Sequence, residues 1–436
     1  MLIWTSNEVK NPGACQEYRI RVPANSLFNM FEVQTYEERG EYPTESLKYM
    51  FNADVIQLYS LAGSAILHRQ QTIQAMAPAV NEAGVLRVPP AFVYDCDDNT
   101  DFVHPFNNTF AWLGVRAYPD ARLLKPGDDL EWKDDHDRPQ GNWIDGQTHV
   151  GGRVFSVERN LLNMKIRHEI IRNSDGATAS SKPLADYFKH VCGQKHVYVY
   201  PNTVVPEDYP AFRAVRKDTE TVRILWQGSS SHLIDWYPLR HAVKAIAEKY
   251  GTKIKFVIFG EKLPFVEDCI PPELLEFHGW VDYSAYKLYR GLLNCDINLC
   301  PLANNAFNRC KSAIKWYEAS VWDDQPEATL AQSGGPYDEI TDGVNGLLFS
   351  NPTEFVEKLS LLIEDAQLRK TLAQNAHEWV MNNRLMKHTT PGLHEFYQEV
   401  RARQVRERTG RSLIKSATDV EMEKVARSVK DLARLR

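Results

Sequence analysis

The chain has 436 residues, of which 43% are hydrophobic and 25% charged, and its formal net charge is -6. At roughly 100–200 residues per domain, this length predicts two or three domains and excludes a single small module. The 10 Trp, 19 Tyr and 18 Phe also exclude an intrinsically disordered chain, which would lack the apolar surface needed to repay its ordering entropy.

The sequence lacks signals for membrane insertion or secretion. Its longest nearly apolar stretch runs from Ile56 to Leu67, well short of the roughly 18 residues that a membrane span needs. The first residues do not form a basic segment followed by an apolar one. Seven scattered cysteines without a Cys-x2-Cys pair fit reduced thiols better than disulfides or zinc. We therefore expect a cytoplasmic protein with no bound metal.

Strand-like runs in the first half lie at 2–4, 54–59, 92–94, 176–179 and 197–200, and helical patterns lie at 64–76, 154–172 and 183–190. An acidic stretch with Gly and Pro between Asp120 and Asp137 predicts a loop or insertion. Three prolines predict an interdomain linker at about 203–220.

From Val222 onward, short β-branched or aromatic runs alternate with helical patterns, which is typical of a parallel sheet covered by helices. Strands are expected at 222–227, 254–259, 274–277, 296–300 and 328–331. We expect Asp235 to cap a helix that Gly251 closes, and another helix to begin near Lys311. Further helices are expected at 283–292 and, as a pair, across 352–383. This half is predicted to be a doubly wound α/β domain.

Charge is concentrated at the end of the chain, because residues 401–436 hold 11 Lys/Arg and 5 Asp/Glu and so leave -12 for residues 1–400. A solvated basic helix is one interpretation of this tail. Contact with a membrane surface or with the DNA backbone is the alternative.

Two loops that follow predicted strands carry groups suited to a diphosphate. The first, Gly228-Ser229-Ser230-Ser231-His232, offers backbone amides at a helix start, although an ordinary turn with capping serines would look the same. In the second, Lys311, Lys315 and Glu318 are spaced to share one helical face. Two cations suit a pyrophosphate and a carboxylate suits a ribose, whereas the alternative is a surface helix with ordinary Lys–Glu pairs.

A third loop, Ser333-Gly-Gly335-Pro336-Tyr337, is followed by Asp342-Gly-Val-Asn-Gly-Leu-Leu. Taken in this order and spacing, the motifs between Val222 and Asn383 resemble the C-terminal half of the family 4 glycosyltransferases of the GT-B fold. In that family the second Glu of a Glu-x7-Glu motif binds the ribose, and Glu318 matches it. The chain departs from the motif at the first Glu, near Lys311. It also has Asp235 roughly where the family often has a phosphate-binding Lys.

The resemblance implies two Rossmann-like doubly wound domains that face each other across a cleft. We expect an acceptor domain at 1–205, a nucleotide-sugar domain at 206–385, and a helical extension at 386–436 that crosses back to the first domain. Lys311 or Lys315 is expected to supply the missing positive charge. Lys311, Lys315 and Glu318 are the expected catalytic residues, and the expected donor-binding residues are Gly228, Ser229, Ser230, His232, Phe307, Asn308, Ser312, Gly335, Pro336 and Tyr337.

The first half resembles the acceptor domain of bacterial and phage members more loosely. The similar segments are 12–23, with Gly13, Tyr18 and Arg19, and 93–98, with Asp95, Asp97 and Asp98. Clustered carboxylates suit Mg²⁺ or Mn²⁺, but GT-B enzymes usually need no bound metal, so Asp97 and Asp98 are expected to bind the acceptor or cap a loop. The residues expected to bind the acceptor are Gly13, Tyr18, Arg19, Asp97, Asp98 and His104.

The resemblance implies transfer of a sugar from a nucleotide-diphosphate sugar, with a UDP-sugar favoured, to an acceptor hydroxyl with retention of configuration. No permanently bound cofactor is expected. The acceptor would be a glycan or lipid-linked sugar, or a hydroxymethylated base in DNA. The alternatives are a GT-B sugar-nucleotide epimerase and a non-catalytic member that binds nucleotide or glycan.

Overall fold

The computed structural model describes residues 1–7, 13–39, 50–60, 62–80, 84, 86–118, 120–133, 139–210, 213–216 and 220–410. It divides into two compact units. Unit 1 comprises residues 1–96, 165–200 and 389 onward, and unit 2 comprises residues 97–164 and 201–388. Most of the basic tail, residues 411–436, lies outside the described residues.

Unit 1 is built on a six-stranded parallel sheet with the order β12-β11-β6-β3-β1-β2. Every residue of the central strands β3 and β6 is buried, as expected for a parallel sheet covered on both faces. The strands are β1 (Leu2–Asn7), β2 (Gln34–Arg39), β3 (Val55–Tyr59), β6 (Ala91–Cys96), β11 (Gly176–Ala179) and β12 (Val197–Val199), and β4 (Ala79–Val80) and β5 (Leu86–Arg87) form a separate pair.

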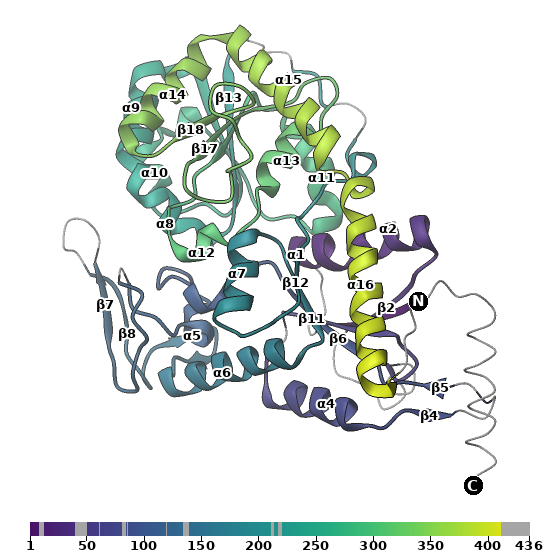
Figure 1. The fold of residues 1–436 in the computed structure, drawn as a ribbon. Coiled ribbons are helices and arrows are strands. Elements are labelled where there is room, and N and C mark those ends of the chain that lie inside the picture. The colour runs from purple at the N-terminus through teal and green to yellow at the C-terminus, as the bar shows by residue number, and fades with distance from the viewer. Residues whose placement is uncertain are drawn as a thin grey trace. The chain divides into compact units, whose positions relative to one another are not determined.

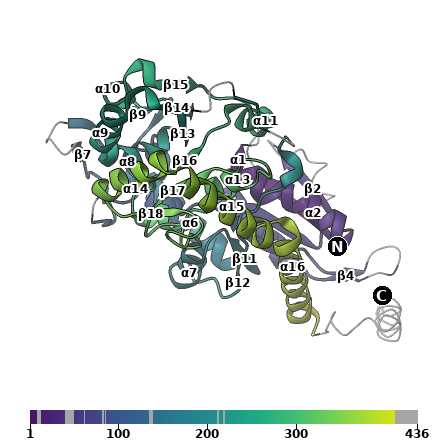
Figure 2. The ribbon, with the colours of Figure 1, turned by 90° about the horizontal axis from the view of Figure 1, so that it is seen from above.

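Helices cover this sheet, and the last of them contacts it closely. In helix α16, the Phe396 ring stacks on Tyr198 of β12 at 5.4 Å. The hydroxyl of Thr390 lies 2.8 Å from that of Ser26 in α2, and both views show α2 beside α16 (Figures 1 and 2). The helices are α1 (Ala14–Gln16), α2 (Val22–Phe31), α4 (Ser64–Ala75), the second half of α6 (Val157–Asn173), α7 (Lys182–His190) and α16 (Met386–Thr409). In the described part of the chain, no helix is both long and apolar enough for a membrane span.

Unit 2 contains a second six-stranded parallel sheet, with the order β15-β14-β13-β16-β17-β18. Numbered along the chain, this is 3-2-1-4-5-6, the Rossmann order, and the direction of winding reverses between β13 and β16. The strands are β13 (Val222–Gly228), β14 (Ile254–Gly260), β15 (Leu275–His278), β16 (Ile297–Cys300), β17 (Ala328–Gln332) and β18 (Leu347–Phe349).

The helices of unit 2 lie on both faces of its sheet. Val243 of α9 and Leu359 of α14 belong to one apolar cluster, and Trp316 of α13 belongs to another. Figure 1 shows α9 and α14 together on one side of the strands and α11 and α13 on the other. The prediction of doubly wound α/β domains is therefore confirmed. The helices are α8 (Leu233–Trp236), α9 (Arg240–Tyr250), α10 (Val266–Cys269), α11 (Tyr283–Leu293), α12 (Ala306–Arg309), α13 (Ile314–Ser320), α14 (Pro352–Glu364) and α15 (Ala366–Asn383).

Residues 97–164 belong to unit 2 although they precede part of unit 1 in the chain. Their apolar side chains Phe110, Trp143 and Phe155 form one cluster with Phe307 of α12. The segment predicted as a loop or insertion includes a strand of a hairpin, and its residues 134–138 lie outside the described part. The elements here are α5 (Phe110–Leu113), β7 (Leu130–Lys133), β8 (Pro139–Trp143), β9 (His149–Val150), β10 (Arg153–Val154) and the first half of α6.

Candidate active site

The candidate site lies at the switch point of the unit 2 sheet. Strands β13 and β16 are parallel neighbours, with Leu225 opposite Asn298, so the loops after Gly228 and Cys300 emerge from the same edge. In open α/β sheets, ligands bind outside the carboxyl ends of the strands at this point. The two loops are those in which the sequence predicted a diphosphate site.

A hydrogen-bonded chain joins His232 of the first loop to Asp235 of α8 and Lys315 of α13. His232 Nδ1 lies 2.7 Å from Asp235 Oδ2, and His232 Nε2 lies 3.2 Å from Lys315 Nζ. A carboxylate only accepts hydrogen bonds, so Nδ1 carries the imidazole proton and Nε2 accepts from the Lys315 ammonium. Burial and the charge of Lys315 lower the pKa of His232 to about 4, which keeps the imidazole neutral at pH 7.

Lys315 is the cation of this chain, and burial lowers its pKa to about 8. In the part of the chain that the structure describes, no carboxylate lies within ion-pair distance of its ammonium. A Cβ atom at Gly228 would lie 3.4 Å from Lys315 Nζ and within 2.9 Å of the rings of His232 and Trp226. Only glycine fits there, so the ammonium stands close to the backbone at the end of β13. Asp235 and Glu318 act on this partly buried ammonium only from beyond contact distance. Its desolvation is therefore costly, and an anionic ligand would relieve that cost.

The prediction that Asp235 caps the following helix is wrong. Residue 239 occupies the N-cap position of α9, and no side chain caps that helix. Instead, Asp235 Oδ1 accepts from the backbone nitrogen of Ala303 at 2.9 Å and from the Asn308 amide at 2.6 Å. With its other oxygen on His232, the carboxylate ties the β13 loop to the β16 loop. Sequence reasoning missed this role because a capping aspartate and a bridging aspartate look the same in a sequence.

The prediction that Lys311 begins the helix of Lys315 and Glu318 is also wrong, because α13 begins at Ile314. Lys311 lies in the preceding turn, where its backbone nitrogen donates to Asn308. Its ammonium lies 3.2 Å from the Asp98 carboxylate and 4.5 Å from the centre of the Phe307 ring. Unlike Lys315, Lys311 is therefore already paired with a carboxylate.

Glu318 lies one turn further along α13 and is 3% exposed. Its carboxylate accepts hydrogen bonds from the Gln227 amide at 2.9 Å, the Tyr286 hydroxyl at 2.8 Å and the Tyr209 hydroxyl at 3.4 Å. Sequence reasoning missed Gln227 and the two tyrosines, because they reach Glu318 from distant parts of the chain. These donors fix the carboxylate beside the end of β13.

The other predicted donor-site residues whose burial is described are partly or fully buried. Ser229 Oγ lies 2.6 Å from Ser231 Oγ, whereas the side chain of Ser230 lies outside the described part. Ser312 Oγ accepts a hydrogen bond from Asn202 at 3.0 Å, a partner that sequence reasoning missed. The structure buries Phe307 and Tyr337 in apolar clusters, buries Gly335, and leaves Pro336 half-buried.

Comparison of the sequence with family models and with curated proteins gives no match. Solved structures do resemble the fold. HepE from Anabaena, crystallised with UDP, has a TM-score of 0.55 and 12% identity, over 92% of this chain and 100% of that chain. A glycosyltransferase from Rickettsia africae has a TM-score of 0.53 and 11% identity, over 92% and 98% of the two chains.

WaaG, a glycosyltransferase involved in lipopolysaccharide biosynthesis, has a TM-score of 0.53 and 12% identity, over 91% of this chain and 99% of that chain. The matches span both parallel sheets, and identities this low establish the fold alone. The chain has the GT-B fold. The fold predicted from the resemblance is therefore confirmed.

The residues predicted to bind an acceptor do not gather in one unit of this GT-B chain. Gly13, Tyr18 and Arg19 belong to unit 1, whereas Asp97, Asp98 and His104 belong to unit 2. Gly13 is exposed and Tyr18 is buried. The Arg19 guanidinium is buried, lies 2.7 Å from Asp95 Oδ1 and donates to the backbone oxygen of Tyr200. Arg19 thus links its helical turn to the ends of β6 and β12 inside unit 1.

The aspartates at the end of β6 and just after it have different partners. Asp95 faces Arg19 and Gln57, and Asp98 faces Lys311. Within the described ranges, no group of three or more His, Cys, Asp or Glu side chains is placed to hold a metal ion. The seven cysteines are free thiols, and all but Cys15 are buried.

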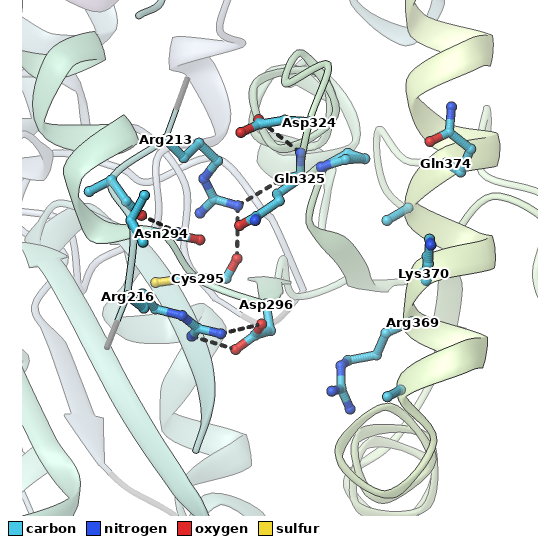
Figure 3. A pocket seen from close by; sticks show the side chains of 15 residues that line it. Arg213, Arg216, Asn294, Cys295, Asp296, Asp324, Gln325, Arg369, Lys370 and Gln374 are labelled. Atoms are coloured by element: carbon cyan, nitrogen blue, oxygen red, sulfur yellow. Dashed lines mark hydrogen bonds and ion pairs between the residues drawn. The ribbon is translucent and has the colours of Figure 1, made fainter. Parts of the chain in front are cut away.

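A cavity of about 600 Å³ lies away from the candidate site, at the opposite edge of the unit 2 sheet, where β16 and β17 begin (Figure 3). Arg216 makes a bidentate pair with Asp296 at 2.8 and 2.9 Å. Arg213 donates to Glu327 at 2.7 Å, and Arg290 binds the same carboxylate at 2.6 Å. These arginines are committed to ion pairs within the fold, and the cavity lies away from the carboxyl ends of the strands. It does not fit the ligand position of a GT-B domain.

Proposed function

We propose that the chain is a glycosyltransferase that moves a sugar from a UDP-sugar to an acceptor hydroxyl with retention of configuration. One observation carries the proposal: Lys315 places a partly buried cation, which no carboxylate of the described residues contacts, beside Gly228, at the switch point of a Rossmann-ordered sheet. Such a position suits the diphosphate of a sugar nucleotide. The complex of HepE with UDP, from a structure of the same fold, supports the choice of nucleotide.

In the proposed reaction, the bond between the anomeric carbon and the diphosphate oxygen breaks and the oxygen keeps the electron pair. The acceptor hydroxyl oxygen forms the new bond on the same face, and its proton passes to the departing phosphate. Lys315 stabilises the negative charge that develops on the diphosphate, because a fixed cation in a site shielded from water acts where charge appears. Glu318 binds the ribose hydroxyls, and backbone amides near Ser312 bind the phosphates.

Among the two lysines expected to supply positive charge, the geometry favours Lys315. The Lys311 ammonium forms an ion pair with the Asp98 carboxylate, whereas the Lys315 ammonium contacts the neutral ring of His232. The acceptor hydroxyl belongs either to a glycan or lipid-linked sugar or to a hydroxymethylated base in DNA.

Thermal unfolding in the presence of UDP-, GDP- and ADP-sugars tests the donor site. We expect a UDP-sugar to raise the unfolding temperature, since a ligand at about 100 times its Kd adds about 2.7 kcal/mol to the stability of the state that binds it. Absence of protection by every nucleotide would contradict the proposal. Conversion of the donor without an acceptor would indicate an epimerase instead, and protection without any turnover would indicate a non-catalytic binding protein.

A further inference from the structure

A pocket of about 240 Å³ lies in unit 2 between residues 102–121 and the segment 304–309, which includes helix α12. We name it the Tyr118 pocket after its most exposed aromatic side chain. Its volume is below the roughly 300–1,000 Å³ of sites that take drug-sized ligands, so a single ring suits it better than a nucleotide. The side chains that give it chemical character are Phe102, His104, Arg116, Tyr118, Asn304 and Arg309.

The walls of the Tyr118 pocket are fixed by contacts within the segment 102–121. Arg116 donates to the backbone oxygen of Ala121 at 2.8 Å, and its guanidinium lies 4.4 Å from the centre of the Phe102 ring. Ala121 has a φ of 56°, a left-handed conformation that is strained for a residue other than glycine. Such strain persists only where the surroundings hold it, and it is common at ligand sites.

His104 contributes a hydrogen-bond donor. Its Nδ1 accepts from the backbone nitrogen of Phe106 at 3.2 Å, so the proton of the neutral ring is on Nε2. Burial lowers the pKa of His104 to about 3, which keeps the ring neutral at physiological pH. The ring stands edge-on to Tyr118, with centroids 4.2 Å apart.

The Tyr118 pocket shares the segment 303–309 with the candidate active site. Ala303 and Asn308 bind the Asp235 carboxylate, which in turn binds His232. The side chain of Asn304 lies against Gly334, where an added Cβ would come within 2.7 Å of Asn304 Nδ2. A ligand in the pocket would therefore lie beside the residues proposed to hold the donor diphosphate.

The polar groups around the Tyr118 pocket are rich in donors. Arg116 and Arg309 carry positive charge, Asn304 and His104 add neutral N–H groups, and none of the described residues that line the pocket is an Asp or Glu. Guanidinium groups recognise carboxylates and phosphates, and the Tyr118 ring offers an apolar face with a polar tip. We infer that the Tyr118 pocket binds one sugar ring that carries a carboxylate or phosphate, as part of the acceptor. The acceptor role rests on the proposed function, whereas the binding itself does not.

Calorimetric titration of the full chain, without donor, with glucuronic acid, a hexose phosphate, glucose and inorganic phosphate tests this inference. We expect the two anionic sugars to bind at least tenfold more tightly than glucose or inorganic phosphate. The exposed Arg309 allows Arg309→Glu to fold, and this variant should lose that preference. Lys370→Glu, at an exposed cation on α15 of the same unit, should keep it. Thermal unfolding of both variants checks their folding.

Equal binding of glucose and glucuronic acid, or unchanged binding by Arg309→Glu, would overturn the inference. Inorganic phosphate binding as tightly as the sugars would reduce the pocket to an anion site and overturn the sugar-ring part. Preferential binding of a hydroxymethylated cytidine nucleoside would overturn it in favour of a DNA base. The proposed function fails separately, if no UDP-sugar protects the chain while glucuronic acid still binds.

Discussion

Replacing Lys315 with Met tests the electrostatic role of this partly buried cation. Methionine keeps an unbranched side chain of similar length and removes the charge. In the wild type, burial lowers the pKa of Lys315 to about 8 from the value of 10.5 that it would have in water. Below pH 8 the charged form of Lys315 therefore destabilises the folded chain relative to the unfolded chain.

The change in the free energy of unfolding caused by Lys315→Met follows from this pKa. At about 1.4 kcal/mol per pH unit, the lowered pKa corresponds to about 3 kcal/mol of destabilisation at pH 7. Loss of the hydrogen bond to His232 leaves its buried Nε2 without that donor, which costs about 1–2 kcal/mol. Lys315→Met should thus be more stable than the wild type by about 1–2 kcal/mol at pH 7, or by a few degrees. The same variant should lose most of its protection by UDP-sugars, because the diphosphate loses its cation.

The pH dependence of the stability difference between the wild type and Lys315→Met gives a second check on the sign of that difference. Between pH 8 and 10.5 the unfolded chain binds the Lys315 proton more tightly than the folded chain, so the wild type should become more stable relative to Lys315→Met. Unfolding temperatures of the wild type and Lys315→Met at pH 7 and pH 10, each with and without a UDP-sugar, measure the relative stability and the protection by donor at both pH values. Lys315→Arg, which stays charged, should still be protected by donor at pH 9.5. A Met variant that is less stable at pH 7, or is protected by UDP-sugar as well as the wild type, would refute the reasoning.

Three further predictions concern the contacts around the site and the cores. Asp235→Asn should weaken donor binding about 10–100-fold with the fold retained, because the amide can donate to His232 Nδ1 and move the imidazole proton to Nε2, where it opposes Lys315. Nitrogen chemical shifts of His232 should report the change of tautomer, and an unchanged tautomer would contradict the argument. Glu327→Gln should destabilise unit 2 by about 3–5 kcal/mol, since it leaves two buried arginines without their shared carboxylate; a loss below 1 kcal/mol in denaturant unfolding would count against it. Gly176→Ala should cost about 1–3 kcal/mol, because the new methyl group would come within 2.9 Å of two side chains of α16. A thermal unfolding temperature equal to that of the wild type would show that α16 does not restrict this position.

Local sequence patterns determined the secondary structure of both sheets well. Buried parallel strands are continuous apolar runs, and helices show a period near 3.6, so both are visible in short windows. The predicted strand 222–227 is β13, and the predicted helix 283–292 is α11. The edge strand β2 was missed, because Gln34–Arg39 reads Gln-Thr-Tyr-Glu-Glu-Arg and has no apolar run. A Cβ atom at Gly228 would come within 2.9 Å of two rings, and the part of this glycine in a ligand site stays a prediction.

Local patterns in the sequence thus determined the α/β class of both halves and the two loops that follow strands, and the resemblance of the motifs to a known family implied the GT-B fold. Tertiary structure alone decided which charges meet. Lys315 and His232 are 83 residues apart, and Lys311 and Asp98 are 213 apart. The helical spacing made the two lysines look equivalent, yet one is paired with a carboxylate and the other lies against a neutral imidazole. An electrostatic environment depends on burial and on partners brought together by folding, and neither is encoded in a local pattern.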